Sequence, residues 1–211
     1  MVESDIRQWY QWVSEPHPLL VLISGPSGVG KDSVLQCMKD MGYPFHFVVT
    51  ATTRAPRSNE VHGEHYLFLS EPQFEAMVEN DEFLEHTLVY GEPKGVPKAQ
   101  VRAALASGKD VIMRVDVQGA ATVRRKVPEV ITVFLTAASE KELVERLKRR
   151  RTESACGLRR RISLAREEME RIPEFDYVVV NREDELDETV RRIVAIMKAE
   201  KCSVQWREVK L

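Results

Sequence analysis

The sequence has few cysteines, no long apolar run and no excess of charge of either sign. Its cysteines, Cys37, Cys156 and Cys202, are scattered and form no C-x-x-C pair, which argues against a disulfide framework or a zinc site and favours a reducing compartment. No stretch reaches the roughly 20 apolar residues of a membrane-spanning helix. The 31 lysines and arginines against 33 acidic residues leave a net charge of −2. We therefore expect neither a membrane nor a nucleic-acid partner.

What remains is the composition of an ordinary globular chain. The 211 residues are 43% hydrophobic and 30% charged, which excludes a collagen-like, coiled-coil or wholly disordered protein. The length suits one sizeable domain or a compact domain carrying an insert.

The first 18 residues form a predicted N-terminal extension. They contain Trp9 and Trp12 but lack the basic start and apolar core of a secretory signal. Acidic residues in this stretch also argue against an intact transit peptide in this chain. We expect a short helix packed at the edge of the domain.

Strand and helix patterns alternate along the rest of the chain. Residues 19–24 form a short apolar run, and residues 33–41 have helical spacing. The β-branched segments 110–115, 130–135 and 177–180 are each followed by a polar, helix-forming stretch. This alternation predicts an α/β fold with a parallel sheet flanked by helices on both faces.

Two segments depart from that pattern. Residues 50–97 are rich in proline and glycine, and their apolar residues alternate at 66–69, which predicts a small mixed insert with antiparallel strands and a short helix around 73–79. Residues 146–161 hold eight lysines and arginines against one glutamate. The core is then expected to comprise residues 19–49, 98–145 and 162–211.

A glycine-rich loop directly follows the first predicted strand. Its candidate ATP-binding residues are Gly25, Pro26, Ser27, Gly28, Val29, Gly30, Lys31, Asp32 and Ser33. The glycines allow positive φ and bring consecutive N–H groups around an anion, and the following helix adds its dipole. Lys31 supplies a mobile charge for the terminal phosphates. A preceding strand and a following helix are the context this pattern requires, so we interpret it as a phosphate-binding loop.

Asp32 stands where the usual pattern has Ser or Thr, whose hydroxyl reaches Mg²⁺. A carboxylate is also a hard oxygen ligand, so we interpret Asp32 as a metal contact, directly or through water. Ser33 offers a hydroxyl one residue later. The alternative is that Asp32 caps the following helix, where a negative charge is favourable.

Further motifs follow the loop in order. They read Thr52-Thr-Arg-Ala-Pro-Arg57, Glu60-x-x-Gly63-x-x-Tyr66-x-Phe68, Asp116-Val-Gln-Gly119, the basic stretch 146–161, and Asp176-Tyr-Val-Val-Val-Asn181. The ordered combination resembles guanylate kinase over about residues 19–200. The resemblance implies a P-loop NTPase core, a GMP-binding insert (50–97) and a helical lid (146–161). It also implies transfer of the γ-phosphate of ATP to GMP or dGMP, giving ADP and GDP, with Mg²⁺ as cofactor.

The resemblance also assigns roles around GMP. Thr50 matches the hydroxyl near guanine O6, while Glu85 and Asp116 match the carboxylates near N1–H and the 2-amino group. A wrong base would leave these groups mispaired. The residues expected at the GMP phosphate are Arg54, Arg57, Tyr66 and Lys94, since arginine bonds phosphate bidentately.

The remaining roles belong to the lid and the adenine end. Arg146, Arg150 and Arg161 match the arginines that close over the transferring phosphoryl group. Asn181 matches a position near the adenine of ATP, with a turn residue after a strand as the alternative.

Some positions depart from the common family pattern. Lys94 and Val96 stand where most members have tyrosine and a hydroxyl residue, and Arg114 replaces the first aspartate of Asp-x-Asp. The variations at Asp32, Lys94 and Arg114 resemble the plant branch directed to plastids and mitochondria. We expect a mature organellar chain, with the cytoplasm as the alternative, and a monomer, with a dimer as the alternative.

The sequence leaves three other functions as alternatives. A guanylate kinase-like interaction module would generally lack the loop and lid, whereas Lys31 and the lid arginines are present. A sugar-bisphosphate kinase is a closer alternative, against which Glu85 and Thr50 favour guanine. Nucleic-acid binding through the basic stretch is disfavoured because it has no interleaved aromatics.

Overall fold

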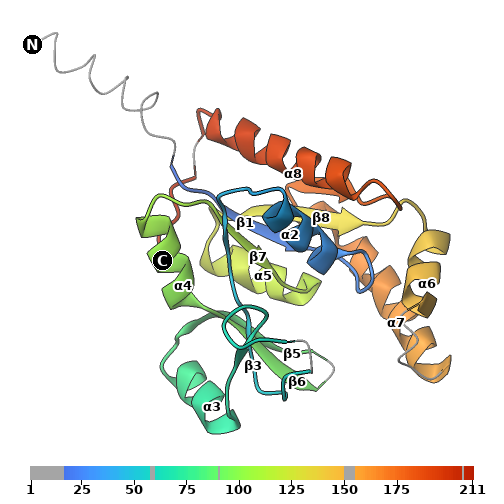
Figure 1. Ribbon diagram of the computed structural model, residues 1–211, viewed down its shortest axis with the longest axis horizontal. Coiled ribbons are helices and arrows are strands. Elements are labelled where there is room, and N and C mark those ends of the chain that lie inside the picture. Colours follow the sequence, from blue (N-terminus) through green and yellow to red (C-terminus); the bar gives the residue numbers. More distant parts are fainter. Residues whose placement is uncertain (1–16, 58–59, 90, 150–154, 206) are drawn as a thin grey trace, which may run out of the picture.

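The structure is a computed structural model that describes residues 17–57, 60–89, 91–149, 155–205 and 207–211 (Figure 1). The helix expected within the first 18 residues falls almost entirely outside this part of the chain.

A five-stranded sheet forms the centre, in the order β2-β7-β1-β8-β9. Every neighbouring pair is parallel. The strands are β1 (Leu20–Ser24), β2 (His46–Phe47), β7 (Val111–Arg114), β8 (Ile131–Thr136) and β9 (Tyr177–Val180). All five residues of the central strand β1 are buried, which explains why the four residues before Ser24 are all apolar. The predicted parallel sheet is confirmed.

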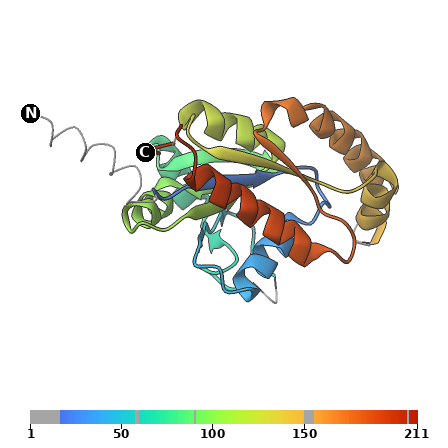
Figure 2. The same cartoon turned by 90° about the horizontal axis from the view of Figure 1, so that it is seen from above.

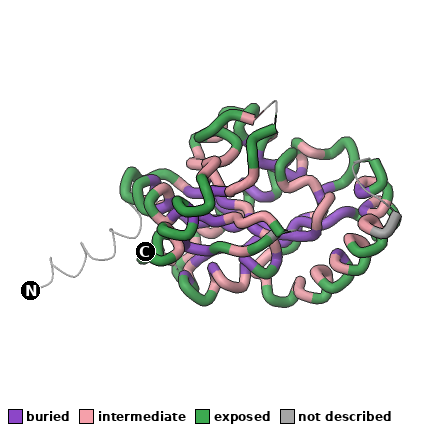
Figure 3. Tube along the Cα trace, turned by 90° about the horizontal axis from the view of Figure 1, so that it is seen from below, coloured by how far each residue is buried: buried purple, intermediate pink, exposed green. Residues whose placement is uncertain are grey.

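Helices cover both faces of this sheet (Figures 1 and 2). Val21 and Ile23 pack with α2 (Lys31–Asp40) and α8 (Leu186–Lys201) on one face. Leu20 and Leu22 point the other way, toward α4 (Lys98–Ala106) and α5 (Val117–Lys126). Successive residues of β1 thus point into two hydrophobic cores, one on each face of the sheet. The buried residues, purple in Figure 3, follow the central strands.

A second, smaller sheet lies beside the main one, at the bottom of Figure 1, in the order β4-β3-β6-β5. Its strands are β3 (Ala51–Thr52), β4 (Leu67–Phe68), β5 (Phe83–Val89) and β6 (Glu92–Pro97), with α3 (Glu71–Glu79) packed against it. α3 begins with a capping box formed by Ser70 and Gln73.

The pairing of β4 differs from the prediction of antiparallel strands. β4 pairs with β3 in parallel, whereas β3–β6 and β5–β6 are antiparallel. The long connection between β3 and β4 lets the chain return and run alongside β3 in the same direction, which a short hairpin turn would not allow.

Two helices follow β8 at one end of the molecule. α6 (Glu140–Arg149) and α7 (Ala155–Glu170) pack together, and the short helix η1 (Ile172–Glu174) leads from them to β9 (Figure 1). Leu143 and Leu147 of α6 are buried in the core that also contains Val29 of the glycine-rich loop. The segment expected to act as a lid spans the end of α6 and the start of α7, and its residues 150–154 lie outside the described chain.

Candidate active site

The glycine-rich loop connects β1 to α2 in a conformation that only glycine accommodates well. Gly25, Gly28 and Gly30 have φ values of 135°, 92° and 97°. A Cβ on Gly25 would lie 2.0 Å from the carbonyl oxygen of Leu135, so the loop also passes too close to β8 for a side chain. The result is a tight turn at the N-terminus of α2, where N–H groups and the helix dipole favour an anion.

Lys31 is the first residue of α2, and its ammonium lies back over the loop. Nζ donates to the carbonyl oxygen of Gly25 and, at 3.1 Å, to that of Pro26. The positive charge is therefore placed at the loop, as binding of terminal phosphates requires.

Glu168 of α7 faces the same loop, and no sequence motif pointed to it. Burial raises the pKa of Glu168, while Lys31 and a hydrogen bond from the Ser27 N–H act in the opposite direction. α7 therefore brings an acidic group beside the loop lysine.

Arg146 and Asn181 hydrogen-bond to the glycine-rich loop. The Arg146 guanidinium donates to the carbonyl oxygens of Val29 (3.2 Å) and Asn181 (2.9 Å), and it pairs with Glu142. The Asn181 amide donates to the Val29 carbonyl at 2.8 Å and accepts from the Thr189 hydroxyl at 3.1 Å. These bonds hold the shape of the loop.

The contacts of Arg146 and Asn181 with the loop do not test their predicted contacts with substrate. Only 4% of Asn181 is exposed, so its side chain serves the loop, and its role near adenine stays a prediction. Arg161 is half-buried on α7, and Arg150 lies outside the described residues. The action of the three arginines on a phosphoryl group also stays a prediction.

Glu85 of β5 is buried, and its carboxyl group is not fully hydrogen-bonded by the residues that the structure describes. It is 3% exposed, and within the described chain its Oε1 has no hydrogen-bond partner. Burial, together with the nearby Asp116, raises the pKa of Glu85 to about 8. Asp116 caps α5 by accepting from the Gly119 N–H at 2.6 Å. A buried acceptor without a donor indicates a place for a ligand that brings N–H groups.

Thr50 lies immediately before β3 and is half-buried. Its carbonyl oxygen accepts from the Leu67 N–H at 2.9 Å, which fixes its backbone to the small sheet. The assignment of its hydroxyl to guanine O6 stays a prediction.

Arg54 is held by a carboxylate that the motif contained without an assigned role. Both terminal nitrogens of Arg54 donate to Glu60, each at 2.6 Å. Hydrogen bonding to Arg54 lowers the pKa of Glu60 to about 2. Glu60 also accepts from the backbone N–H of Arg57, whose side chain is exposed. Glu60 thus orients the guanidinium of Arg54 and anchors the backbone of Arg57, the two predicted phosphate-binding arginines. In the sequence, the spacing of Glu60 from these arginines was the only indication of this role.

Three cationic side chains lie near the aromatic ring of Tyr66. Cζ of Arg54 lies 4.9 Å from the ring centroid, Cζ of Arg114 lies 5.5 Å away, and Nζ of Lys94 lies 5.9 Å away. Burial lowers the pKa of Lys94. Tyr66, Arg54 and Lys94 are predicted phosphate-binding residues, and the fold brings them together.

Arg114 connects this cluster to the glycine-rich loop. Its guanidinium pairs with Asp32 in the first turn of α2 and donates to the Tyr66 hydroxyl at 3.3 Å. Arg114 of β7 therefore links Asp32 of α2 to Tyr66, which directly precedes β4 of the small sheet.

The donor set fits Mg²⁺ that arrives with a nucleotide. Within the described chain, no group of three or more His, Cys, Asp or Glu side chains is arranged to hold a metal by itself. Mg²⁺ in kinases takes most of its ligands from phosphates and water and needs only one or two protein oxygens. The exposed carboxylate of Asp32, beside the loop, has the chemistry for such a contact.

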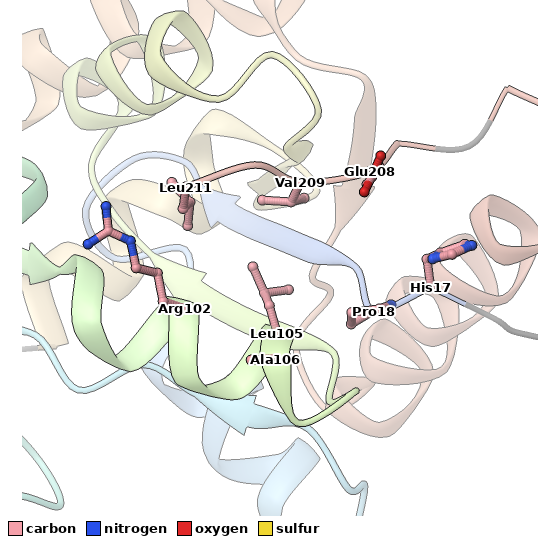
Figure 4. A pocket seen from close by; sticks show the side chains of 8 residues that line it. All are labelled: His17, Pro18, Arg102, Leu105, Ala106, Glu208, Val209 and Leu211. Carbon is pink, nitrogen blue, oxygen red and sulfur yellow. The ribbon is translucent and has the colours of Figure 1, made fainter.

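A pocket elsewhere in the molecule contains none of these residues. It has a volume of about 440 Å³ and lies between α4, the segment preceding β1 and the C-terminal tail (Figure 4). Leu105, Val209 and Leu211 line it and pack on the second core. It marks where the tail docks on α4.

The parallel sheet, the glycine-rich loop and Lys31 at the start of α2 define a P-loop NTPase fold. A family model described as guanylate kinase matches residues 17–200. Guanylate kinase 2, chloroplastic/mitochondrial, of Oryza sativa is 49% identical over 93% of this chain and 69% of its own length. The guanylate kinase of Caldanaerobacter subterraneus is 41% identical over 88% and 89% respectively.

A solved structure agrees with these relatives. The guanylate kinase from Anaplasma phagocytophilum superposes with a TM-score of 0.71 at 28% identity, covering 90% of this chain and 89% of its own. The chain belongs to the guanylate kinase family.

Proposed function

We propose that the protein transfers the γ-phosphate of ATP to GMP or dGMP, giving ADP and GDP. Family membership supports this activity, and the buried Glu85 carboxyl is the structural observation that carries it. Guanine presents two adjacent donors, N1–H and the 2-amino group, to an acceptor that lacks partners within the described chain. Adenine offers no N1–H, so the buried carboxyl would remain unsatisfied.

At the GMP end, the proposed roles are those that the family pattern assigns, and the burial of Glu85 and the cluster around Tyr66 support them. Glu85 and Asp116 accept from the guanine donors, and the Thr50 hydroxyl lies at O6. Arg54, Arg57, Tyr66 and Lys94 bind the phosphate. Glu60 keeps Arg54 in place for this task by its paired 2.6 Å hydrogen bonds.

At the ATP end, residues 25–33 cradle the phosphates through backbone N–H groups. Lys31 neutralises charge that spreads over the transferring oxygens. Arg146, Arg150 and Arg161 add donors as the lid segment 146–161 closes, and Asn181 supports the adenine end. Mg²⁺ bound with ATP would supply further charge neutralisation, and Asp32 is the residue that would hold it, directly or through water. Catalysis then rests on positioning and charge stabilisation, without a covalent intermediate.

A coupled assay of ADP release tests the function. It compares GMP, dGMP, IMP, AMP, CMP and UMP as acceptors at fixed MgATP, with a sugar bisphosphate as an added acceptor. We expect turnover with GMP and a marked loss with IMP, which lacks the 2-amino group. Preferential turnover of the sugar bisphosphate, or no turnover of any acceptor, would contradict the proposal.

We also propose that the protein works in a plastid or mitochondrion, as a monomer. The description of the rice relative as chloroplastic/mitochondrial supports the location. Among the described helices, none has the length and apolarity needed to span a bilayer. Sedimentation analysis of the purified chain would distinguish a monomer from a dimer.

A further inference from the structure

Arg114 occupies a central position that the assignments above do not use. It ends β7, in register with Ile23 of β1, the strand that leads into the phosphate loop. Its guanidinium pairs with Asp32 on one side and reaches the hydroxyl of Tyr66 on the other. One side chain from the core thus touches both the phosphate loop helix and the cluster assigned to the GMP phosphate.

The cations of this cluster are unevenly paired with carboxylates. Three cations lie near the Tyr66 ring: Arg54, Lys94 and Arg114. Arg54 pairs with both Glu60 and Glu92, and Arg114 pairs with Asp32. Among the described residues, Lys94 makes no ion pair within 4 Å. A dianionic phosphate is the ligand chemistry that matches such an arrangement.

The pair between Arg114 and Asp32 is not explained by stability. The Arg114 side chain is 22% exposed, whereas that of Asp32 is 67% exposed. A mostly exposed carboxylate gives little net stabilisation because solvent screens it, while placing a guanidinium in a largely buried site is costly. A second anion would compensate that cost.

We propose that Arg114 binds the phosphate of GMP from the core side, together with Arg54 and Lys94, and that Asp32 positions its guanidinium. This inference rests on the proposed GMP-binding role of the cluster. Arginine has five N–H donors in a rigid fork, so contacts to Asp32 and Tyr66 leave donors for a phosphate oxygen. Asp32 thereby acts on GMP through Arg114, in addition to any contact with Mg²⁺.

The test compares a ligand that carries the phosphate with one that lacks it. KM for GMP and the competitive inhibition constant of guanosine are measured at saturating MgATP. The enzymes are wild type, Arg114→Gln, Arg114→Lys, Asp32→Asn and the Arg114→Gln/Asp32→Asn double variant. Thermal melting of each variant checks folding.

We expect Arg114→Gln to raise KM for GMP roughly 10- to 100-fold, the range for losing a hydrogen bond to a charged group. Guanosine inhibition should be unchanged, and Arg114→Lys should recover part of the loss. Asp32→Asn should raise KM for GMP less. The double variant should be no worse than Arg114→Gln, because Asp32 acts through Arg114.

Other outcomes overturn the inference. Equal weakening of GMP and guanosine would make Arg114 a structural residue, and an unchanged KM for GMP would exclude contact with the phosphate. Additive effects in the double variant would separate Asp32 from Arg114. Failure of the proposed function is distinct, because it would appear in the wild-type enzyme as absence of GMP turnover.

Discussion

The carboxyl group of Glu85 lies directly against the backbone of Gly119, so that a Cβ on this glycine would sit 2.9 Å from Oε1. Real Cβ atoms do not approach that closely, and the first turn of α5 therefore forms a wall behind the carboxyl. The glycine of the motif 116–119 is needed for proximity, since its φ is not in the left-handed region.

The first prediction is that Gly119→Ala weakens GMP binding while preserving the fold. Alanine favours the helix by about 1 kcal/mol, so the loss should come from displacement of Glu85 and not from unfolding. KM for GMP and the melting temperature measure the two effects. Gln118→Ala, at an exposed neighbouring position on α5, is the control. A normal KM in Gly119→Ala would show that the wall has no part in recognition.

The second prediction concerns base selectivity. Glu85→Gln replaces one acceptor by a donor facing the guanine N–H groups, so the preference for GMP over other purine monophosphates should fall by about 1–3 kcal/mol. Ratios of kcat/KM across the purine nucleotides measure this change. If the ratios equal those of wild type, another residue reads the guanine edge.

The third prediction concerns protons. Burial and Asp116 raise the pKa of Glu85 from 4.5 to about 8, so the folded protein holds a proton that the unfolded chain has released. This contribution to the free energy of unfolding is therefore present at low pH and is lost as the pH rises from about 4.5 to about 8. Guanine donors favour the ionised carboxylate, so binding should release a proton near pH 7.

Guanosine is the ligand for that measurement because it has no phosphate to titrate. Calorimetry in two buffers of different ionisation enthalpy gives the number of protons released. Glu85→Gln should abolish the release and remove the corresponding slope of stability against pH. Equal proton release in wild type and Glu85→Gln would assign the titration to another group.

The fourth prediction is that Lys31→Ala abolishes turnover without unfolding the chain. Its ammonium donates to the carbonyl oxygens of Gly25 and Pro26 at the loop, so its loss removes charge stabilisation at the phosphates and leaves the apolar cores unchanged. Steady-state kcat and thermal melting measure the two outcomes. Lys39→Ala, on the exposed end of the same helix, should remain active. Near-normal turnover in a folded Lys31→Ala enzyme would remove the loop from catalysis.

The fifth prediction addresses Asp32 and the metal. Asp32→Ala should require more Mg²⁺ for half-maximal activity at saturating GMP, and Asp32→Ser should recover part of the loss through a hydroxyl ligand. Activity is titrated against free Mg²⁺ at fixed ATP. Superimposable Mg²⁺ curves, with only the melting temperature changed, would assign Asp32 to capping of α2.

The sequence predicted best what local patterns determine. β1 is buried on both faces and is therefore apolar up to Ser24, and the loop after it needs glycines at positive φ, so both were identified from neighbouring residues. The predicted antiparallel strands of the insert are present as β3–β6 and β5–β6, but the parallel pairing of β4 with β3 was not predicted, because it depends on how a long connection folds, which no local period encodes.

Contacts between distant segments were also beyond local patterns. Arg114 was identified as a departure from the family pattern, yet its pairing with Asp32 joins β7 to α2 and appears only in the folded chain. Likewise, Glu60 stood inside a motif, but its hold on Arg54 depends on the side-chain geometry of the loop.

The bonds from Arg146 and Asn181 to the Val29 carbonyl bear on the order in which the chain acquires its final structure. The glycine-rich loop emerges among the first segments of the domain, whereas Asn181 directly follows β9, the last strand to be made. A nascent chain that ends before this residue carries all the loop glycines without the amide that holds Val29. The bond from the Asn181 amide to Val29 therefore forms only when β9 has joined the sheet, so the braced form of the loop depends on the last strand of the chain.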